Sequence, residues 1–575
     1  MKVIDSMFTV RPLPVFVLLL CAAAPAAAQD RDALVREAVA RFEAESAKAA
    51  APAPSDRGII VAQGSLRELG LNEAVEIALA QNLDIAVERL SPQAFDFQVA
   101  GLRNLYRPLA NSTVGQRHQV NPATNTLNGG SRVVNDTTTY NFGVSQEVPW
   151  GGGNFSLAFG NTRLATSNLL ANFNPAFNSN LTATFTQPLF RDFGIDNNRQ
   201  QIAIAQINRD IASESLRAAV AQTVANVRNA YWELAYTRAA VEVAQRSLDL
   251  AQKLVEDNQA RVEVGTLAPI DVVQAEAEAA NRRQIVAQTE AALATAQLSL
   301  KRLLVTGTSD PLWTQELRAT DVPQLTSPPL DVEGAVRQAL ERRTDLATAR
   351  KNLDSNDVTL RFWRNQTRPA VDLQLSYGAT GLGGQRLERT GSGVAAELTG
   401  TVVPGGYSDA LQLLRDRDFP TWNAAVTVNY PLGGNNADGQ YARNRVLRTQ
   451  QSTRLRVLEL QVATEVTNAA LQVQANLRRV DAARAARALA ERQLEAEQSK
   501  FEVGLSTNFF VVQSQRDLAD AQNVELRALT DLQRALVTFE RAQEAPAGNG
   551  GNNTQNTGTQ NATGNQNTGG QGGGQ

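Results

Sequence analysis

Two long stretches of the chain place apolar residues at every seventh position. In the first stretch these positions run from Val220 to Val262, and in the second from Val466 to Phe501, with Arg487 as the one break. Seven-residue spacing is typical of helices that pack on other helices as coiled coils. Residues 200–264 contain no proline or glycine, so we expect one helix of ~100 Å at about 1.5 Å per residue. This length exceeds what a globular domain needs.

Other stretches alternate apolar and polar residues with a period of two. The clearest cover residues 140–145, 181–186, 371–376 and 424–429. The alternation predicts strands with one apolar and one polar face. A length of about 8–11 residues suits a tilted strand of a membrane barrel. Strands of a soluble sheet alternate in the same way, so this pattern alone leaves both environments open.

Four dipeptide landmarks recur in the same order in the two halves of the chain. They are Ala74-Val75 and Ala335-Val336, Arg107-Pro108 and Arg368-Pro369, Pro188-Leu189 and Pro431-Leu432, and Val264-Gly265 and Val503-Gly504. Each half therefore reads as a helix, a strand region, a very long helix, a turn and a further helix. We predict a mainly helical protein built from two tandem structural repeats.

The repeats and their flanks define the predicted domains. Repeat 1 covers 65–310, with strands within about 109–190 and a long helix at about 200–264. Repeat 2 covers 331–544, with strands within about 370–432 and a long helix at about 441–503, and a linker at 311–330 joins the two. The flanks are a signal peptide at 1–28, an N-terminal extension and linker at 29–64, and a disordered Gly/Asn/Gln-rich tail at 545–575.

Composition excludes several classes of function. The 55 Lys and Arg are balanced by 58 Asp and Glu, so the chain lacks the excess of cations that nucleic-acid binding needs. One His and one Cys are too few for a zinc site of Cys and His ligands. His118 would have to serve any Ser-His-Asp triad, and no Walker A sequence is present. We therefore expect no enzyme activity, no cofactor and no metal, and any energy from nucleotide hydrolysis would have to come from a partner.

Export and membrane entry follow from the same patterns. The predicted signal peptide contains Cys21 and ends in small residues before Gln29. No later stretch has 18 uncharged apolar residues, so entry into a membrane requires a closed barrel in which all backbone groups are paired. About four strands cannot close a barrel, and a long helix with only a heptad stripe cannot bury itself. Assembly of several chains would satisfy both elements.

These landmarks resemble the TolC-type outer-membrane efflux protein family over about residues 65–545. The matching residues are Leu71-Asn72-Glu73-Ala74-Val75, the Arg-Pro before each strand region, Gln187-Pro188-Leu189, and the turns Val264-Gly265-Thr266 and Val503-Gly504-Leu505. The resemblance implies a homotrimer in which long coiled-coil helices form an α-barrel in the periplasm, below a 12-stranded transmembrane β-barrel with four strands per protomer. Such a channel-tunnel is the outer-membrane exit duct of a tripartite efflux or type I secretion system. It works with a periplasmic adaptor and an inner-membrane pump of the RND, ABC or MFS type.

The resemblance also assigns candidate site residues. The turns Val264-Gly265-Thr266 and Val503-Gly504-Leu505 would contact the adaptor, and their glycines would also end the long helices. Asp271 would line a periplasmic constriction as a ring of three carboxylates, or would only favour a helix start. Phe510 stands where relatives have an acidic residue and Phe501 where some have Tyr, which indicates a more apolar constriction. Phe501 also fits a packed heptad position.

One alternative function is an exported coiled-coil scaffold of the cell envelope without a pore. A scaffold has no need for amphipathic strands at matched places in two repeats, which favours the channel. An exported hydrolase is disfavoured, because the chain offers no catalytic constellation beyond scattered carboxylates. The choice between drug or metal efflux and protein secretion stays open, since the duct is shared machinery.

Overall fold

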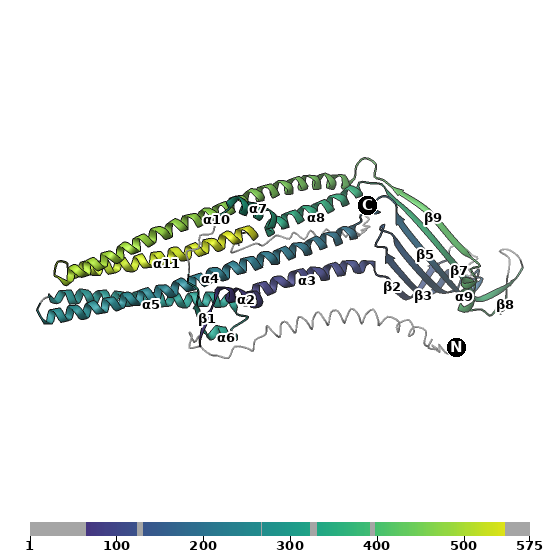
Figure 1. The fold of residues 1–575 in the computed structure, drawn as a ribbon. Helices are drawn as coiled ribbons and strands as arrows, with labels where there is room; N and C mark the ends of the chain where they lie inside the picture. Colours follow the sequence, from purple (N-terminus) through teal and green to yellow (C-terminus); the bar gives the residue numbers. More distant parts are fainter. Residues whose placement is uncertain (1–64, 124–129, 266, 323–329, 392–396, 547–575) are drawn as a thin grey trace, which may run out of the picture. The chain divides into compact units, whose positions relative to one another are not determined.

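A computed structural model describes residues 65–123, 130–265, 267–322, 330–391 and 397–546 (Figure 1). The predicted signal peptide and linker, Thr266 and the predicted tail from residue 547 onward lie outside these ranges. The chain divides into two compact units. The first contains Met1–Ala94, Thr223–Leu330 and Ala470–Thr538, and the second contains Phe95–Gln222, Asp331–Ala469 and Phe539–Gln575.

Helices make up most of the described chain, which confirms the expectation of a mainly helical protein. The main helices are α2 (Leu71–Gln81), α3 (Leu83–Arg103), α4 (Asn197–Glu263), α5 (Pro269–Leu304), α7 (Val332–Arg342), α8 (Thr344–Gln366), α10 (Asn436–Glu502) and α11 (Asn508–Glu544). The short ones are α6 (Pro311–Thr314), α9 (Tyr407–Asp416) and a 3-10 turn at Asn104–Tyr106. Helices α4 and α10 have 67 residues each. Across the described ranges, no helix is both long and apolar enough to cross a membrane.

One sheet of seven antiparallel strands belongs to the second unit. Its strands are β2 (Leu109–Pro122), β3 (Arg132–Glu147), β4 (Asn154–Thr166), β5 (Phe173–Pro188), β7 (Ala370–Thr390), β8 (Glu397–Val403) and β9 (Pro420–Asn429). The order is β2-β3-β4-β5-β7. Strand β7 pairs with β9 through its first residues and with β8 through its last. The prediction of four strands per chain is therefore wrong, because the longer first strand region alone folds into two successive hairpins.

The strand register sorts the sheet residues into two faces, because residues paired across strands point to the same side. Leu375 pairs with Phe185 on one side and with Ala424 on the other, and Tyr377 pairs with Trp422. We call this side the apolar face; its large exposed side chains are Val114, Val120, Phe142, Val144, Phe155, Leu157, Leu375, Tyr377, Trp422, Val426 and Val428. The opposite face carries polar residues such as Thr182, Thr184 and Gln374.

The first unit has a core built around Tyr231 of α4. The ring packs with Leu234, Leu300 and Leu304 in one buried cluster. Its hydroxyl lies 3.0 Å from the carbonyl oxygen of Leu69 and 2.7 Å from the Asp321 carboxylate. Leu69 ends strand β1 (Leu66–Leu69), which pairs in parallel with β6 (Glu316–Ala319). Tyr231 therefore fixes this two-stranded sheet to α4, and burial beside Asp321 raises the pKa of its hydroxyl to about 12.

The second unit has a core in which a buried arginine holds three helices together. Arg343 precedes α8 and its side chain is only 1% exposed. It donates from Nη2 to Asp345 Oδ2 (2.8 Å), and from Nη1 to Glu465 Oε2 of α10 (2.6 Å) and to the carbonyl oxygen of Ala542 in α11 (3.1 Å). Around it pack Ala335, Ala339, Leu346, Val462, Val466 and Ala469. Burial of a guanidinium is tolerable here because each of these donors has an oxygen partner.

Candidate functional site

Two exposed turns in the first unit connect α4 to α5 and α10 to α11. Gly265 and Gly504 lie in the left-handed region, with φ of +80° and +76°. Their N–H groups donate to the carbonyl oxygens of Val262 and Phe501, at 3.0 and 3.2 Å. A Cβ at either glycine would meet open space, so glycine is favoured there by the backbone conformation and not by crowding.

The side chains around these turns are apolar and face solvent. Val264 and Val503 are both at least 70% exposed, and Leu505 is 80% exposed. Further exposed apolar residues follow at the start of α5 and α11: Ile270, Val273, Phe509 and Phe510. Clustered exposed apolar side chains mark surfaces that contact another molecule. We call these two turns with their flanking side chains the tip surface.

The candidate constriction residues occupy three different environments. Phe501 is 8% exposed and packs with Leu254 and Val511, with the Arg261 guanidinium 4.6 Å above its ring. Phe510 is exposed and contacts Phe509 edge to face, with ring centroids 5.6 Å apart. The two phenylalanines therefore do not share a surface within one chain. Phe501 has the environment of a packed coiled-coil residue.

Asp271 lies in the first helical turn of α5, close to both exposed turns, and its side chain is half-buried. Its main-chain carbonyl oxygen accepts hydrogen bonds from the Nδ2 groups of Asn258 (3.5 Å) and Asn508 (3.3 Å). These amides come from α4 and α11, so the backbone at Asp271 is held by both neighbouring helices. The roles of Asp271, Phe501 and Phe510 at a constriction stay predictions.

A buried ion cluster near the tip surface escaped the sequence-based expectations. Glu278 of α5 is 4% exposed and accepts from Arg282 Nε (2.7 Å) and from Arg516 Nε of α11 (3.1 Å to Oε2). Burial raises the pKa of the Glu278 carboxyl, but the hydrogen bonds and charges of Arg516 and Arg282 outweigh burial and hold it below its usual value. The spacing of Glu278 and Arg282 by four residues is visible in the sequence, whereas the partner Arg516 lies 238 positions away and is not.

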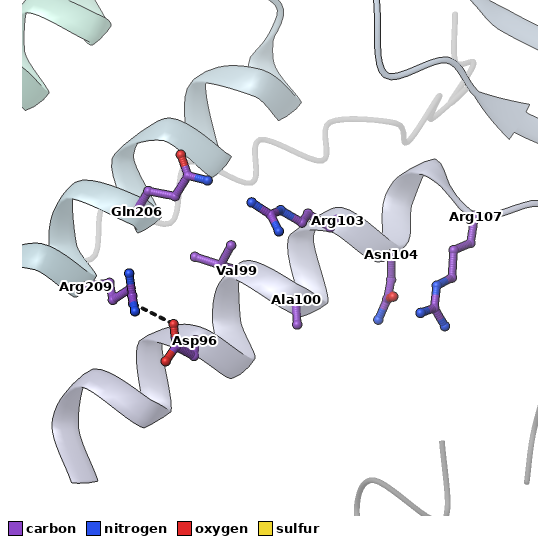
Figure 2. Close-up of a pocket in the computed structure, with 8 residues that line it drawn as sticks. All are labelled: Asp96, Val99, Ala100, Arg103, Asn104, Arg107, Gln206 and Arg209. Atoms are coloured by element: carbon purple, nitrogen blue, oxygen red, sulfur yellow. Dashed lines mark ion pairs between the residues drawn. The ribbon is translucent and has the colours of Figure 1, made fainter. Parts of the chain in front are cut away.

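Two further polar clusters line cavities. In the first unit, Glu233 of α4 pairs with Arg527 (3.0 Å) and Arg534 (2.9 Å) of α11 beside a cavity of about 590 Å³. In the second unit, a cavity of about 440 Å³ lies between α3 and α4 (Figure 2). There, Arg209 Nε contacts Asp96 Oδ1 at 2.6 Å, and Arg103 and Arg107 also line the cavity.

Neither cavity holds a set of groups suited to catalysis. Within the described ranges, no cluster of three or more His, Cys, Asp or Glu could hold a metal ion. His118 lies on β2, where its Nδ1 contacts Asp136 of β3 at 2.5 Å, and both side chains are exposed. This pair is a cross-strand contact at the surface of the sheet.

Comparisons with known proteins identify the family of the chain and solved structures that share its fold. A family model described as "Outer membrane efflux protein" matches residues 74–306 and 335–543. No curated protein matches the chain. Similar solved structures include the CmeC outer membrane channel of Campylobacter jejuni, with a TM-score of 0.59 and 12% identity over 82% of this chain and 85% of that one. The outer membrane protein VceC of Vibrio cholerae gives 0.57 and 17% over 82% and 96%. The MtrE outer membrane channel of Neisseria gonorrhoeae, in its open state, gives 0.55 and 16% over 86% and 94%.

Proposed function

The chain belongs to the outer membrane efflux protein family, and from this premise we propose that three copies form the exit duct of a tripartite efflux or type I secretion system. In this proposal the three sheets close one β-barrel in the outer membrane, and the long helices form a tunnel in the periplasm. Substrates pass through it passively, since the protein is a transport protein and not an enzyme.

The observation that carries the proposal is a sheet with an exposed apolar face and two open edges. Among the described strands, β2 pairs only with β3, and β9 only with β7. Open edges are very costly in lipid, because unpaired backbone groups have no water to bond. Pairing β2 of one chain with β9 of the next removes both edges.

The strand count also supports closure. Six strands run at the level of the apolar face: β2, β3, β4, β5, β7 and β9. Because six is even, β9 of one chain runs antiparallel to β2 of its neighbour. Six strands from each of three chains give eighteen, a number at which a barrel encloses an aqueous channel.

Unpaired heptad stripes on the helices support the same assembly. On α3 the exposed stripe holds Leu83, Val87, Leu90 and Phe97, and on α10 it holds Val446, Val457 and Leu460. Both stripes follow the three-and-four spacing of a coiled-coil seam. Within one chain these side chains face solvent, so packing α3 of one chain on α10 of a neighbour would bury them.

The tip surface is the site we assign to the periplasmic adaptor, which links the duct to an RND, ABC or MFS pump. Its support is the group of exposed apolar side chains at Val264, Val503 and Leu505. A pore-less scaffold, the alternative function, is disfavoured by the family membership.

Conductance and crosslinking test the proposal. We expect the purified protein to migrate as a trimer and to form discrete conducting channels in a planar lipid bilayer. In cells, a photo-crosslinker at Val264 or Leu505 is expected to capture a periplasmic adaptor, whereas one at Arg456, an exposed residue of α10, is not. A monomer that neither inserts nor conducts contradicts the proposal.

A further inference from the structure

Helix α9 lies on the sheet, at the end of β7 far from α8 (Figure 1). It joins β8 to β9 and contacts β7 and β5. A Cβ added to Gly381 or Gly383 of β7 would overlap backbone atoms of Ala410 in α9. The pairing of β7 with β5 is unbroken from Asp372 to Gly383. The absent side chains of Gly381 and Gly383 therefore point to the same side as Leu375 and Tyr377.

The sheet surface under α9 is small and polar. Asn161 of β4 and Ser179 of β5 are paired in register there, and both are buried. The Tyr407 hydroxyl of α9 donates to Asn161 Oδ1 (2.8 Å), while Asn161 Nδ2 donates to the Tyr140 carbonyl oxygen (3.1 Å). The rings of Tyr407 and Phe177 lie 6.1 Å apart. Close backbone approach and this hydrogen bond together hold α9 on the sheet.

The outward side of α9 is polar. Its apolar residues Tyr407, Ala410, Leu411, Leu413 and Leu414 lie on one side of the helix, and Ala410 is fully buried. The remaining residues are exposed and mostly charged or hydrogen-bonding: Ser408, Asp409, Gln412, Arg415 and Asp416. Charged groups on the lipid side of a barrel cost about 2–4 kcal/mol at the bilayer midplane and little at its boundary. This side of α9 is therefore incompatible with the hydrocarbon layer.

The order of residues along β7 places α9 just beyond an apolar band. From Val371 to Ala379 the strand advances eight residues, about 26 Å at about 3.3 Å each. Barrel strands tilt by about 35–45°, so this span rises roughly 20 Å and lies within the outward apolar band of a membrane barrel, which is about 25 Å tall. The exposed aromatic pair Tyr377–Trp422 lies near its far end, as the aromatic girdle of a barrel does. Gly381, under α9, follows Tyr377 by four residues, about 13 Å along the strand.

We propose that α9 is an interfacial helix whose polar side contacts the lipid headgroups of the outer leaflet. The inference rests on the proposed function, which turns the apolar face of the sheet toward lipid. The charged side of α9 suits a headgroup layer and its apolar side is covered by the sheet. Three copies of α9 in the trimer fix the depth at which the barrel sits, because sinking would drive their charges into hydrocarbon.

Site-specific labels in the full trimer test this placement. The sequence has one cysteine, Cys21, in the predicted signal peptide, so single-cysteine variants are simple to make. Environment-sensitive fluorophores are attached in Gln412→Cys on α9, Leu375→Cys on the apolar face and Thr184→Cys on the opposite face. Each trimer is placed in lipid nanodiscs that carry a quencher either on the headgroup or deep in the acyl chain.

The two quenchers separate the possible results. We expect the headgroup quencher to reduce emission from Gln412→Cys most, the acyl-chain quencher to reduce emission from Leu375→Cys most, and neither to affect Thr184→Cys strongly. A Gln412 label that neither quencher reaches, while the Leu375 label responds to the acyl-chain quencher, overturns the role of α9 alone. A Leu375 label that ignores both quenchers contradicts the proposed membrane function itself.

Displacing α9 provides a second measurement. Gly381→Val introduces side-chain atoms where the Ala410 backbone lies, so α9 is expected to detach. Combined with Gln412→Cys, this change is expected to abolish quenching by the headgroup quencher, while the Leu375 label and the trimer are unaffected. Unchanged quenching at Gln412 in a correctly assembled Gly381→Val trimer also contradicts the proposal.

Discussion

Glu278 of α5 and Arg516 of α11 form a buried ion pair, with Arg516 Nε 3.1 Å from Glu278 Oε2. Arg282, one turn further along α5, is buried against the same carboxylate. Glu278 therefore neutralises one buried and one half-exposed guanidinium and ties two helices together near the tip surface. Removing its charge leaves Arg282 without its acidic partner.

Loss of this carboxylate is expected to destabilise the first unit. Glu278→Gln should lower the free energy of unfolding by roughly 1–3 kcal/mol, because a buried cation then loses its charged partner. Denaturant unfolding followed by circular dichroism measures the change. Glu276→Gln, at an exposed position of the same helix, is the control and should have little effect. Equal effects of the two changes would show that the pair contributes nothing.

The same pair predicts a loss of stability in acid. The pKa of Glu278 is lowered on folding below its usual 4.5 by the two arginines, so its contribution is fully present above that value. It disappears as the pH falls through the folded pKa, when the carboxyl becomes protonated. Hydrogen-exchange protection factors along α5 and α11, which correct for the pH dependence of the intrinsic exchange rate, should therefore fall at lower pH in the wild-type protein. Glu278→Gln should lack this component, and an unchanged pH dependence in that variant would contradict the assignment.

The turn glycines are expected to respond to substitution through backbone conformation alone. Gly504→Ala should cost about 1 kcal/mol, since alanine disfavours a φ of +76°, although its Cβ meets no neighbour. Gly439→Ala lies inside α10, also in open space, and should instead stabilise the protein by up to about 1 kcal/mol. Melting temperatures of the two variants are thus expected to move in opposite directions.

Arg343 is expected to be the costliest of the charged residues to remove from the second unit. Arg343→Leu leaves Glu465 and Asp345 without their shared cation and the Ala542 carbonyl oxygen without its donor. A loss of about 3 kcal/mol or more is expected. Arg342→Leu, at the exposed neighbouring position, is the matched control. Thermal unfolding distinguishes them, and similar melting temperatures would argue against a structural role for Arg343.

The exposed stripe of α10 gives a prediction about assembly. Leu460→Glu places a charge in the proposed seam between chains and should weaken the trimer without unfolding the chain, since Leu460 is exposed within one chain. Arg448→Gln, on the opposite side of the same helix, where Arg448 pairs with Asp357 of α8, should leave the trimer intact. Size-exclusion chromatography with light scattering reads the outcome, and a fully trimeric Leu460→Glu protein would locate the contact elsewhere.

Local patterns in the sequence predict the helices far better than they predict the sheet. Heptads from Val220 to Val262 and the absence of Pro and Gly are sufficient for α4, because helical hydrogen bonds are local. The number of strands depends on how residues 109–190 divide into hairpins. The alternation of apolar and polar residues does not show where the chain turns back. Helix α9 was not anticipated. It is only ten residues long, and its position depends on Gly381, which lies in β7.

In the candidate site too, local features could be predicted from the sequence and contacts between distant residues could not. The turn at Gly504 is readable because its residue type reports a backbone conformation. The partnership of Glu278 with Arg516, and the buried position of Arg343, depend on contacts between residues far apart in the chain. Nothing in the local sequence marks one arginine among many as buried.

Helices α4 and α10 have 67 residues each, and their packing limits which insertions and deletions the sequence can accept. Deleting one residue from either helix turns everything beyond the deletion by about 100° and moves its seam off its partner. Gaps in these two helices are therefore tolerable only near multiples of seven residues. Among related sequences, we therefore expect insertions and deletions to accumulate in the loops and to be rare in α4 and α10.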